Sequence, residues 1–202
     1  MINEKKNNNI KKILLAAGES KRFGDKNKLS EIINGKPIIN HILDTLFKIF
    51  DPSELIVIVG HEKNIIKNLI FNKDIKILEN KNYRKGIGTS ISLGMNNLNA
   101  DINGVMIIPA DMPYINSKDL IKLEKKFIEL NCVKVVMPEH NYRIGNPVIL
   151  PRKYFDTLKN LKDDFGAKSL IKKKDVITLK TGFGTIFDID TKEELAETKA
   201  NY

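Results

Sequence analysis

Cationic side chains gather near the start of the chain, directly after a short apolar run. The run 13–17 ends at Gly18, and Lys21, Arg22 and Lys28 follow shortly afterwards. A run of this length that ends at a turn residue is typical of a buried strand, and glycine lets the backbone turn or approach a ligand closely. Loop N–H groups, a forked guanidinium and a compact ammonium together suit a polyphosphate. An exposed turn with solvated cations fits the same spacing, so the spacing leaves both interpretations open.

A carboxylate follows another apolar run, at Asp111 in the segment 109–113 (PADMP). The two prolines stiffen the turn around it. Mg²⁺ takes one or two protein carboxylates beside phosphate oxygens, so Asp111 is a candidate ligand for such an ion. The competing interpretation is an aspartate that satisfies the backbone of its own turn.

Two more carboxylates, Asp188 and Asp190, alternate along the segment 185–190, which we predict to be extended. We expect these two side chains to point to opposite faces, so that only one of the pair reaches a metal. We expect the other to cap the terminal helix that opens at Thr191.

A second glycine loop, 85–90 (KGIGTS), ends in two hydroxyls at a predicted helix start. Thr89 or Ser90 could simply be the N-cap of that helix. Gly60, with His61, follows a further apolar run, 55–59 (LIVIV), and again marks the end of a predicted buried strand.

The first loop resembles a specific signature. The pattern L-A-A-G-x-S-x-R-[MF]-G followed by K-L is matched from Leu15 to Leu29. It resembles the loop of nucleotidyltransferases that activate phosphorylated substrates with an NTP, and it is neither a Walker loop nor a dinucleotide fingerprint. The segments PADMP, GIGTS, IGNPV and DDFGAKSL are similar to motifs of molybdenum cofactor cytidylyltransferases, within the MobA-like NTP transferase superfamily. The resemblance covers nearly the whole chain, in order.

That resemblance implies transfer of CMP from CTP to the phosphate of molybdenum-bearing molybdopterin, with release of pyrophosphate. It implies Mg²⁺ as the cofactor, and a molybdoenzyme or its maturation chaperone as a possible partner. The implied catalytic residues are Arg22, Lys28 and Asp111. The implied nucleotide-binding residues are Leu15, Ala16, Ala17, Gly18, Arg22, Lys28, Gly60, Gly88, Thr89 and Ser90. The implied metal ligands are Asp111 and one residue of the C-terminal pair, for which we favour Asp188 over Asp190.

The implied acceptor-binding residues are Asn146, Pro147, Asp164, Gly166 and Lys168. This chain departs from the family pattern at two positions of that region. Asp163 stands where the family usually has Gly, and Lys168 stands where it usually has Arg. Lysine replaces a forked donor with a point charge, so the acceptor is the least constrained part of the prediction.

Other functions remain open at this point. A guanylyltransferase for the same cofactor would usually carry L-A-G-G, whereas Ala17 fits the pyrimidine-using side. A sugar-phosphate nucleotidyltransferase would share the chemistry. A non-catalytic NTP-binding maturation partner is a third alternative, against which Asp111 argues because a binding module has less need of a metal carboxylate.

Length and composition fit one globular domain. The chain has 202 residues, of which 42% are hydrophobic and 29% charged. Its net charge of +9 comes from lysines scattered along the chain, without an arginine-rich arm, so we expect neither nucleic acid nor a membrane as partner. The single cysteine, Cys132, excludes an intramolecular disulfide and a multi-cysteine metal site. The first residues lack the apolar core of a signal peptide, and we expect a cytoplasmic protein.

Apolar strands that alternate with helices position these residues. We predict a disordered tail over 1–9 and a nucleotidyltransferase domain over 10–202. The expected fold is a single-domain, three-layer α/β/α arrangement with a mostly parallel, Rossmann-like sheet of the nucleotide-diphospho-sugar-transferase type. Ligands bind such sheets beyond the carboxyl ends of the strands, where Gly18, Gly60 and Asp111 are expected. The predicted strands are 10–17, 55–59, 75–79, 104–109, 133–137 and 176–179, and the predicted helices are 38–50, 62–72, 90–98, 117–130, 151–160, 164–173 and one from 191.

Overall fold

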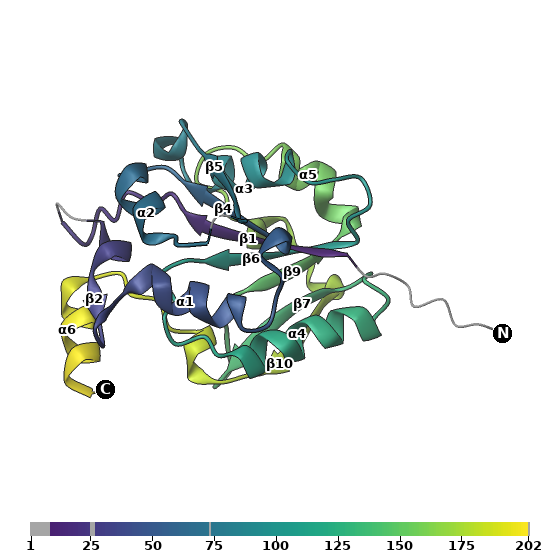
Figure 1. Cartoon of the computed structure of the whole chain (residues 1–202). Helices are drawn as coiled ribbons and strands as arrows, with labels where there is room; N and C mark the ends of the chain where they lie inside the picture. The colour runs from purple at the N-terminus through teal and green to yellow at the C-terminus, as the bar shows by residue number, and fades with distance from the viewer. Residues whose placement is uncertain (1–8, 25–26, 73, 202) are drawn as a thin grey trace.

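The structure is a computed structural model that describes residues 9–24, 27–72 and 74–201 (Figure 1). The predicted disordered tail lies outside the described residues except for Asn9. Asn9 is held in place, because its backbone N–H donates to Asn103 and its side-chain amide donates to Asp101. No helix among the described residues is long and apolar enough to cross a membrane.

A mostly parallel sheet forms the centre of the molecule. Its central strands, β1 (Ile10–Ala16), β4 (Leu55–Val59) and β6 (Gly104–Pro109), are apolar runs buried on both sides. The complete order is β10 (Val176–Lys180), β7 (Val135–His140), β9 (Val148–Pro151), β6, β1, β4 and β5 (Lys76–Glu79), with the short β8 (Arg143–Ile144) on β7. β8 and β9 are antiparallel to their neighbours, whereas the other pairs of this sheet are parallel. The small hairpin of β2 (Ile32–Ile33) and β3 (Lys36–Pro37) stands apart from it.

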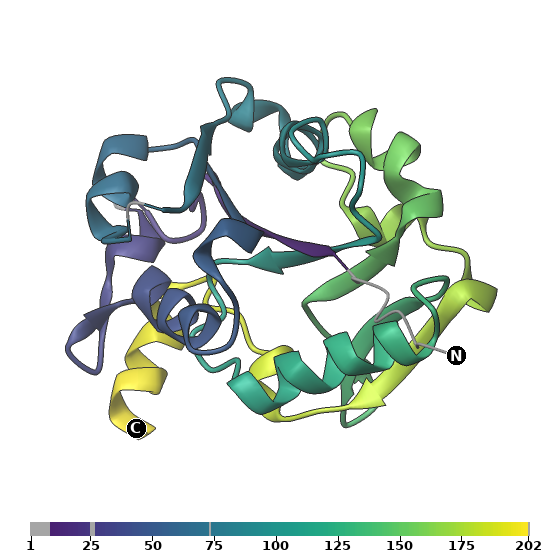
Figure 2. The same cartoon turned by 45° about the vertical axis from the view of Figure 1, so that its right-hand side comes forward.

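Helices cover both faces of the sheet, as the two views show (Figures 1 and 2). On one face, a buried cluster joins the sheet to α1 (Ile38–Phe47), α2 (Lys63–Leu69) and α4 (Ser117–Glu129). On the other face, a second cluster joins it to α3 (Ile87–Met95) and α5 (Phe155–Lys159). The C-terminal α6 (Lys192–Asn201) lies beside the hairpin. The expected three-layer fold is therefore confirmed.

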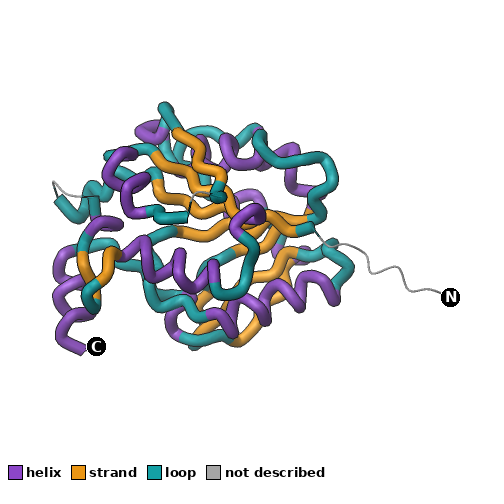
Figure 3. Tube along the Cα trace, in the orientation of Figure 1, coloured by secondary structure: helices purple, strands orange, loops and turns teal. Residues whose placement is uncertain are grey.

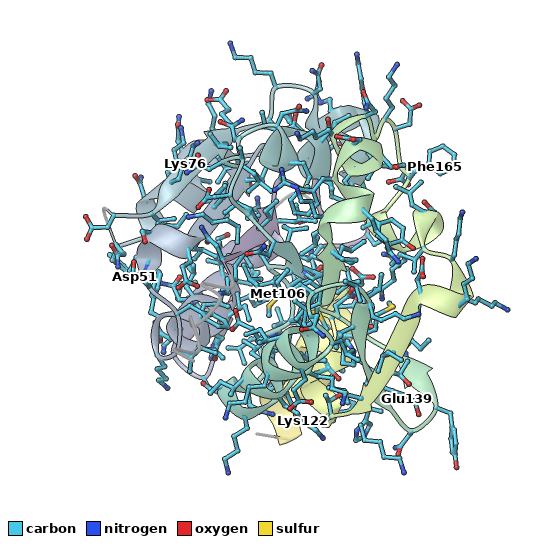
Figure 4. All side chains as sticks on the ribbon, turned by 90° about the vertical axis from the view of Figure 1, so that its right-hand side faces the viewer. Asp51, Lys76, Met106, Lys122, Glu139 and Phe165 are labelled. Carbon is cyan, nitrogen blue, oxygen red and sulfur yellow. The ribbon has the colours of Figure 1, made fainter. Side chains whose placement is uncertain are left out.

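Alternation along β1 connects the two cores. Leu14 and Ala16 belong to the first cluster, and Ile13 and Ala17 belong to the second. Met106 of β6 likewise lies in the interior, as Figure 4 shows. A strand buried on both faces reads as a continuous apolar run, which is why the sequence pattern located these strands.

Several predicted elements differ from the structure, whose helices, strands and loops are distinguished by colour in Figure 3. The helix expected over 90–98 begins three residues earlier, because the turn at Gly86 already starts it. The helix expected over 164–173 is only a short 3₁₀ turn, Ala167–Leu170. Asn116, whose side chain accepts from the Asp119 N–H, caps α4 in place of the expected Ser117.

Candidate active site

The carboxyl ends of the central parallel strands meet at one edge of the sheet. The register pairs Ala16 with Val59, Val59 with Glu79, and Leu15 with Pro109. The loops that follow these residues therefore start side by side, which is where ligands of open α/β sheets bind.

A cleft of about 500 Å³ lies at this edge. Of the residues predicted to bind the nucleotide, six line it: Leu15, Ala17, Gly18, Arg22, Lys28 and Ser90. The other four, Ala16, Gly60, Gly88 and Thr89, are not among its lining residues. Ala16 instead packs into the core with 1% of its surface exposed.

The first glycine loop is anchored to the body by buried side chains. Phe23 is 2% exposed and Leu29 is 4% exposed, so both ends of the loop are held in the core. Between them, Asn27 accepts from the Leu29 N–H and donates to the His61 carbonyl of the neighbouring strand end. The loop therefore presents its polar side chains from a fixed base.

Lys28 lies at the centre of the polar end of the cleft. Its ammonium donates to Asp111 Oδ2 at 2.6 Å and to Asp190 Oδ1 at 2.8 Å. Burial alone would lower the pKa of Lys28, but the charges and hydrogen bonds of the two carboxylates raise it above its ordinary value. The side chain is therefore a permanent cation.

Arg22 also reaches this end from the loop. Its guanidinium donates to Asp190 Oδ2 at 2.5 Å while the side chain stays largely exposed to solvent. Arg22 and Lys28 thus stand on either side of one carboxylate, where both could turn to phosphate oxygens.

Three carboxylates converge beside Lys28. Asp111, Asp188 and Asp190 each offer an oxygen within 4.8 Å of the others. The remaining oxygen of Asp111, Oδ1, is buried and lacks a hydrogen-bond partner among the described residues. A buried carboxylate oxygen without a partner is costly unless a ligand satisfies it, so the cluster fits a hard divalent cation.

The expectation that Asp188 and Asp190 face opposite ways is wrong. The segment 185–190 forms no strand; it curves past the turn after β6, where the Ile189 N–H donates to the Asp111 carbonyl. Moreover, residues two positions apart lie on the same face even of a fully extended chain, so the spacing of Asp188 and Asp190 gave no ground for separating them. The expected cap is wrong too, because Thr191 and Glu194 form a reciprocal capping box for α6.

The three acids differ in their electrostatic surroundings. Partial burial and the negative charges of Asp111 and Asp190 raise the pKa of Asp188 above its ordinary value. Burial also acts to raise the pKa of Asp190, but Lys28 and Arg22 outweigh it, and that pKa lies below its ordinary value. The two cations therefore stabilise the charged form of Asp190, whereas burial and the neighbouring carboxylates disfavour the charged form of Asp188.

Gly60 and Gly88 act through close backbone approach. A Cβ on Gly60 would lie 2.7 Å from Tyr83 Cβ and 2.9 Å from the Ala17 carbonyl oxygen. A Cβ on Gly88 would lie 2.6 Å from the Lys162 carbonyl oxygen, and the Gly88 N–H donates to the Asp163 carbonyl. Because glycine has no Cβ, neighbouring segments can pack closely at both positions. Neither glycine is among the residues that line the cleft.

Comparison with known proteins decides the family. The family model of the MobA-like NTP transferase domain matches residues 12–177, which is most of the chain. The chain belongs to this family.

A sequence relative and several solved structures are also similar to this chain. The bifunctional protein GlmU of Caldicellulosiruptor saccharolyticus is 34% identical over 144 residues, which span 66% of this chain and only 29% of that protein's length. The crystal structure of Rv0371c from Mycobacterium tuberculosis H37Rv matches with a TM-score of 0.80 at 18% identity, over 96% of this chain and 98% of that one. The complex of that protein with manganese matches with a TM-score of 0.77 at 16% identity, over 96% and 100% of the chains. Molybdopterin-guanine dinucleotide biosynthesis protein A from Archaeoglobus fulgidus matches with a TM-score of 0.63 at 17% identity, over 94% and 97%. These distant structures establish the fold.

The acceptor-side residues are spread around the cleft. Asp164 lines it, whereas Asn146, Pro147, Gly166 and Lys168 do not. Burial lowers the pKa of Lys168, and the negative charge of Asp188 acts to raise it. Lys168 is therefore coupled electrostatically to the carboxylate cluster. The family's glycine position also finds an explanation, because Asp163 adopts a left-handed φ of 53°, a conformation that glycine takes without strain.

Other lining residues were not predicted from the sequence. Tyr83, Arg84 and Lys85 form the wall that faces the first glycine loop, and Glu19 lies on that loop. Arg84 Nε lies 3.5 Å from Glu19 Oε1, so an ion pair joins the two walls. The sequence feature that could have predicted this wall is the pair of basic residues, Arg84 and Lys85, directly before Gly86.

Proposed function

We propose that the chain is a metal-dependent nucleotidyltransferase that transfers CMP from CTP to the phosphate of a molybdopterin-type acceptor and releases pyrophosphate. One observation carries the proposal: Lys28 and three convergent aspartates stand at the edge of a cleft formed by the signature glycine loop. A cationic loop for phosphates beside a carboxylate cluster for a metal suits an NTP better than any neutral ligand.

The chemistry needs no covalent enzyme intermediate. An oxygen of the acceptor phosphate forms a bond to the α-phosphorus of CTP. The bond from that phosphorus to the oxygen bridging the β-phosphate breaks, and pyrophosphate leaves with the electron pair. Lys28 and Arg22 would stabilise the charge that develops on the leaving group, so the chain acts by positioning and charge neutralisation.

Asp111, Asp188 and Asp190 would hold the divalent ion. Mg²⁺ is the ion we propose, because it is a hard cation that binds carboxylate oxygens together with phosphate oxygens. When bound, it supplies Lewis-acid polarisation of phosphate oxygens. The manganese complex of Rv0371c supports a divalent ion in this fold.

The base and the acceptor are the finer parts of the proposal. Ala17 lines the cleft beside Leu15 and supports a pyrimidine, because guanylyl relatives usually carry glycine at that position. We propose a molybdopterin-type acceptor because the segments 144–148 and 163–170 resemble the acceptor-side motifs of molybdenum cofactor cytidylyltransferases. A molybdoenzyme or its chaperone is the partner that this acceptor would imply. Because nucleoside triphosphates are held inside cells, the proposal places the reaction in the cytoplasm.

Pyrophosphate release with each of the four NTPs tests this proposal. The acceptors are purified molybdenum cofactor and, in parallel, a panel of sugar 1-phosphates. We expect release to require the cofactor and to be fastest with CTP. A kcat/KM for GTP equal to or above that for CTP would overturn the cytidylyl assignment. Release only with a sugar phosphate would replace the acceptor, and binding of CTP without release in any mixture would support a non-catalytic partner.

A further inference from the structure

Asn80 supports the second glycine loop from behind. It directly follows β5 and is 4% exposed. Its amide nitrogen donates to Thr89 Oγ1 and to Ser90 Oγ, each at 2.8 Å. Its amide oxygen accepts from the Asn82 N–H at 2.9 Å. One buried side chain therefore holds both hydroxyls at the start of α3.

The Asn82 N–H fixes the direction of this network. A backbone N–H only donates, so the Asn80 atom that faces it is the oxygen, and the amide nitrogen faces the hydroxyls. Each hydroxyl oxygen must then accept from Asn80. Thr89 in turn donates its proton to the carbonyl oxygens of Gly86, at 2.8 Å, and Asn82, at 3.1 Å.

Ser90 differs from Thr89 in where its proton can go. The Ser90 oxygen accepts from Asn80. Among the described residues, no carbonyl oxygen accepts the Ser90 proton, whereas the carbonyl oxygens of Gly86 and Asn82 accept the Thr89 proton. Ser90 also lines the cleft, whereas Thr89 does not. The hydroxyl of Ser90 is therefore left as a donor toward the cleft.

The lining of the cleft includes a charged end and several uncharged residues. Lys28, Arg22 and Asp111 mark the charged end, which suits the phosphates. Leu15, Ala17, Ile87 and Ser90 are uncharged lining residues that could face a flat ring, although Arg84 and Lys85 also line the cleft close to Ile87 in sequence. A nucleotide whose phosphates lie at the charged end could place its base near these uncharged residues.

We infer that Asn80 is a positioning residue that presents the Ser90 hydroxyl as a hydrogen-bond donor to the base, and that this polarity favours cytosine. Cytosine offers neighbouring acceptors at O2 and N3. Both pyrimidines accept at O2, so the discriminating atom is N3, which accepts in cytosine and donates in uracil. Guanine carries donors at N1 and N2. The inference rests on the proposed function, since it assumes that an NTP occupies the cleft.

The substitution Asn80→Asp tests the inference. The new carboxylate keeps the size of the amide and still accepts from the Asn82 N–H, but it cannot donate. The Ser90 proton would then turn to the carboxylate, and a lone pair would face the base. Binding of CTP and of UTP is measured by calorimetry with Mg²⁺ and without acceptor. We expect Asn80→Asp to lower the CTP-to-UTP affinity ratio by at least about tenfold, the scale of one unsatisfied buried polar group.

Two further variants keep the test sharp. Asn64→Asp adds the same charge at an exposed residue of α2 in the neighbouring groove that Asn80 also lines, and should leave the ratio unchanged. Ser90→Ala removes the donor and should lower the ratio in the same direction. Adding Asn80→Asp to Ser90→Ala should then change the ratio little, because the two residues act in series.

The outcomes distinguish a failure of the proposed use of CTP from a failure of the proposed role of Asn80. If the wild type binds neither pyrimidine nucleotide, or prefers UTP, the proposed use of CTP fails. If the wild type prefers CTP while folded Asn80→Asp and Ser90→Ala both keep the ratio, the proposed function stands and the role of Asn80 is wrong. Should Asn80→Asp not fold, as judged by circular dichroism, an unchanged ratio in Ser90→Ala would overturn the inference by itself.

Discussion

Asp111 is the residue on which the proposed metal site depends most. Its Oδ1 is buried and has no hydrogen-bond partner among the described residues, and its Oδ2 accepts from Lys28. Asp111 therefore lies where the proposed metal site meets the cationic loop. Asp111→Asn keeps the shape but removes the charge. We expect kcat to fall by at least about 100-fold, as for loss of a strong electrostatic contact to the transition state. The measurement is steady-state pyrophosphate release with Mg²⁺.

The fold provides the control for that variant. Asp156→Asn removes a carboxylate from the exposed surface of α5 and should keep full activity. The melting temperature of Asp111→Asn should stay within about 4 °C of the wild type, the shift that about 1 kcal/mol gives in a chain of this size. Near-normal turnover in the folded variant would remove Asp111 from the proposed mechanism.

Lys28 allows a prediction in which catalysis and metal binding change in opposite directions. Lys28→Ala should lower kcat/KM for CTP by about 100-fold or more, because a buried cation is lost from the phosphate end. Without nucleotide, the same variant should bind Mn²⁺ about tenfold more tightly, since Asp111 and Asp190 lose their counter-charge. Electron paramagnetic resonance titration measures the free Mn²⁺. Weaker Mn²⁺ binding in Lys28→Ala would show that the three carboxylates do not form the ion site.

At the scale of elements, β1 contains a buried charged residue, Lys12, within a largely apolar strand. Lys12 is 1% exposed, pairs with Glu54 and with Glu124 of α4 at 2.9 Å, and lies over the ring of Phe50. Lys12→Met would leave the partly buried Glu124 carboxylate without its counter-charge. We expect a loss of about 3–5 kcal/mol in unfolding free energy at pH 7.5, measured in urea. Lys125→Met, at an exposed position of α4, should change it by less than about 0.5 kcal/mol.

The same network gives this prediction a pH dependence. Burial raises the pKa of Glu124 above its ordinary value, and Lys12 opposes that shift. Without Lys12 the pKa rises further, so the folded state holds the proton more tightly than the unfolded chain does. The destabilisation should therefore be smallest near pH 4 and should grow as the pH rises through the folded-state pKa. A loss that is equal at pH 4 and pH 7.5 would contradict this explanation.

The loop between α5 and β10 contains three of the five proposed acceptor-binding residues, Asp164, Gly166 and Lys168. Lys168 is electrostatically coupled to Asp188 but does not line the cleft. Lys168→Ala should raise the KM for the acceptor by about tenfold, the value of one charge-assisted hydrogen bond. The Kd for CTP, measured by calorimetry, should not change. Lys173→Ala serves as the matched control, and an equal loss of CTP affinity in Lys168→Ala would assign Lys168 to the nucleotide side.

For the whole molecule, the sequence predicts the architecture better than the irregular segments. Continuous apolar runs locate β1, β4 and β6, and parallel pairing then brings Gly18, Gly60 and Asp111 to one edge. The convergence of Asp188 and Asp190 could have been predicted, because residues two positions apart share one face of an extended chain. The irregular path of 185–190 could not, because it depends on the tertiary hydrogen bond from the Ile189 N–H to the Asp111 carbonyl. The wall at Tyr83 and Arg84 was missed for a related reason: its residues meet the first loop only through the fold.

The fate of the phosphates of CTP tests the central claim most directly. CTP labelled with ³²P at the α or at the γ position is incubated with purified molybdenum cofactor, Mg²⁺ and either the wild type or Asp111→Asn. The account predicts that the α label is transferred to the cofactor and the γ label is found in pyrophosphate, with both signals strongly reduced in Asp111→Asn. Transfer of the γ label to the acceptor, or no transfer by a wild-type protein that binds CTP, would contradict it.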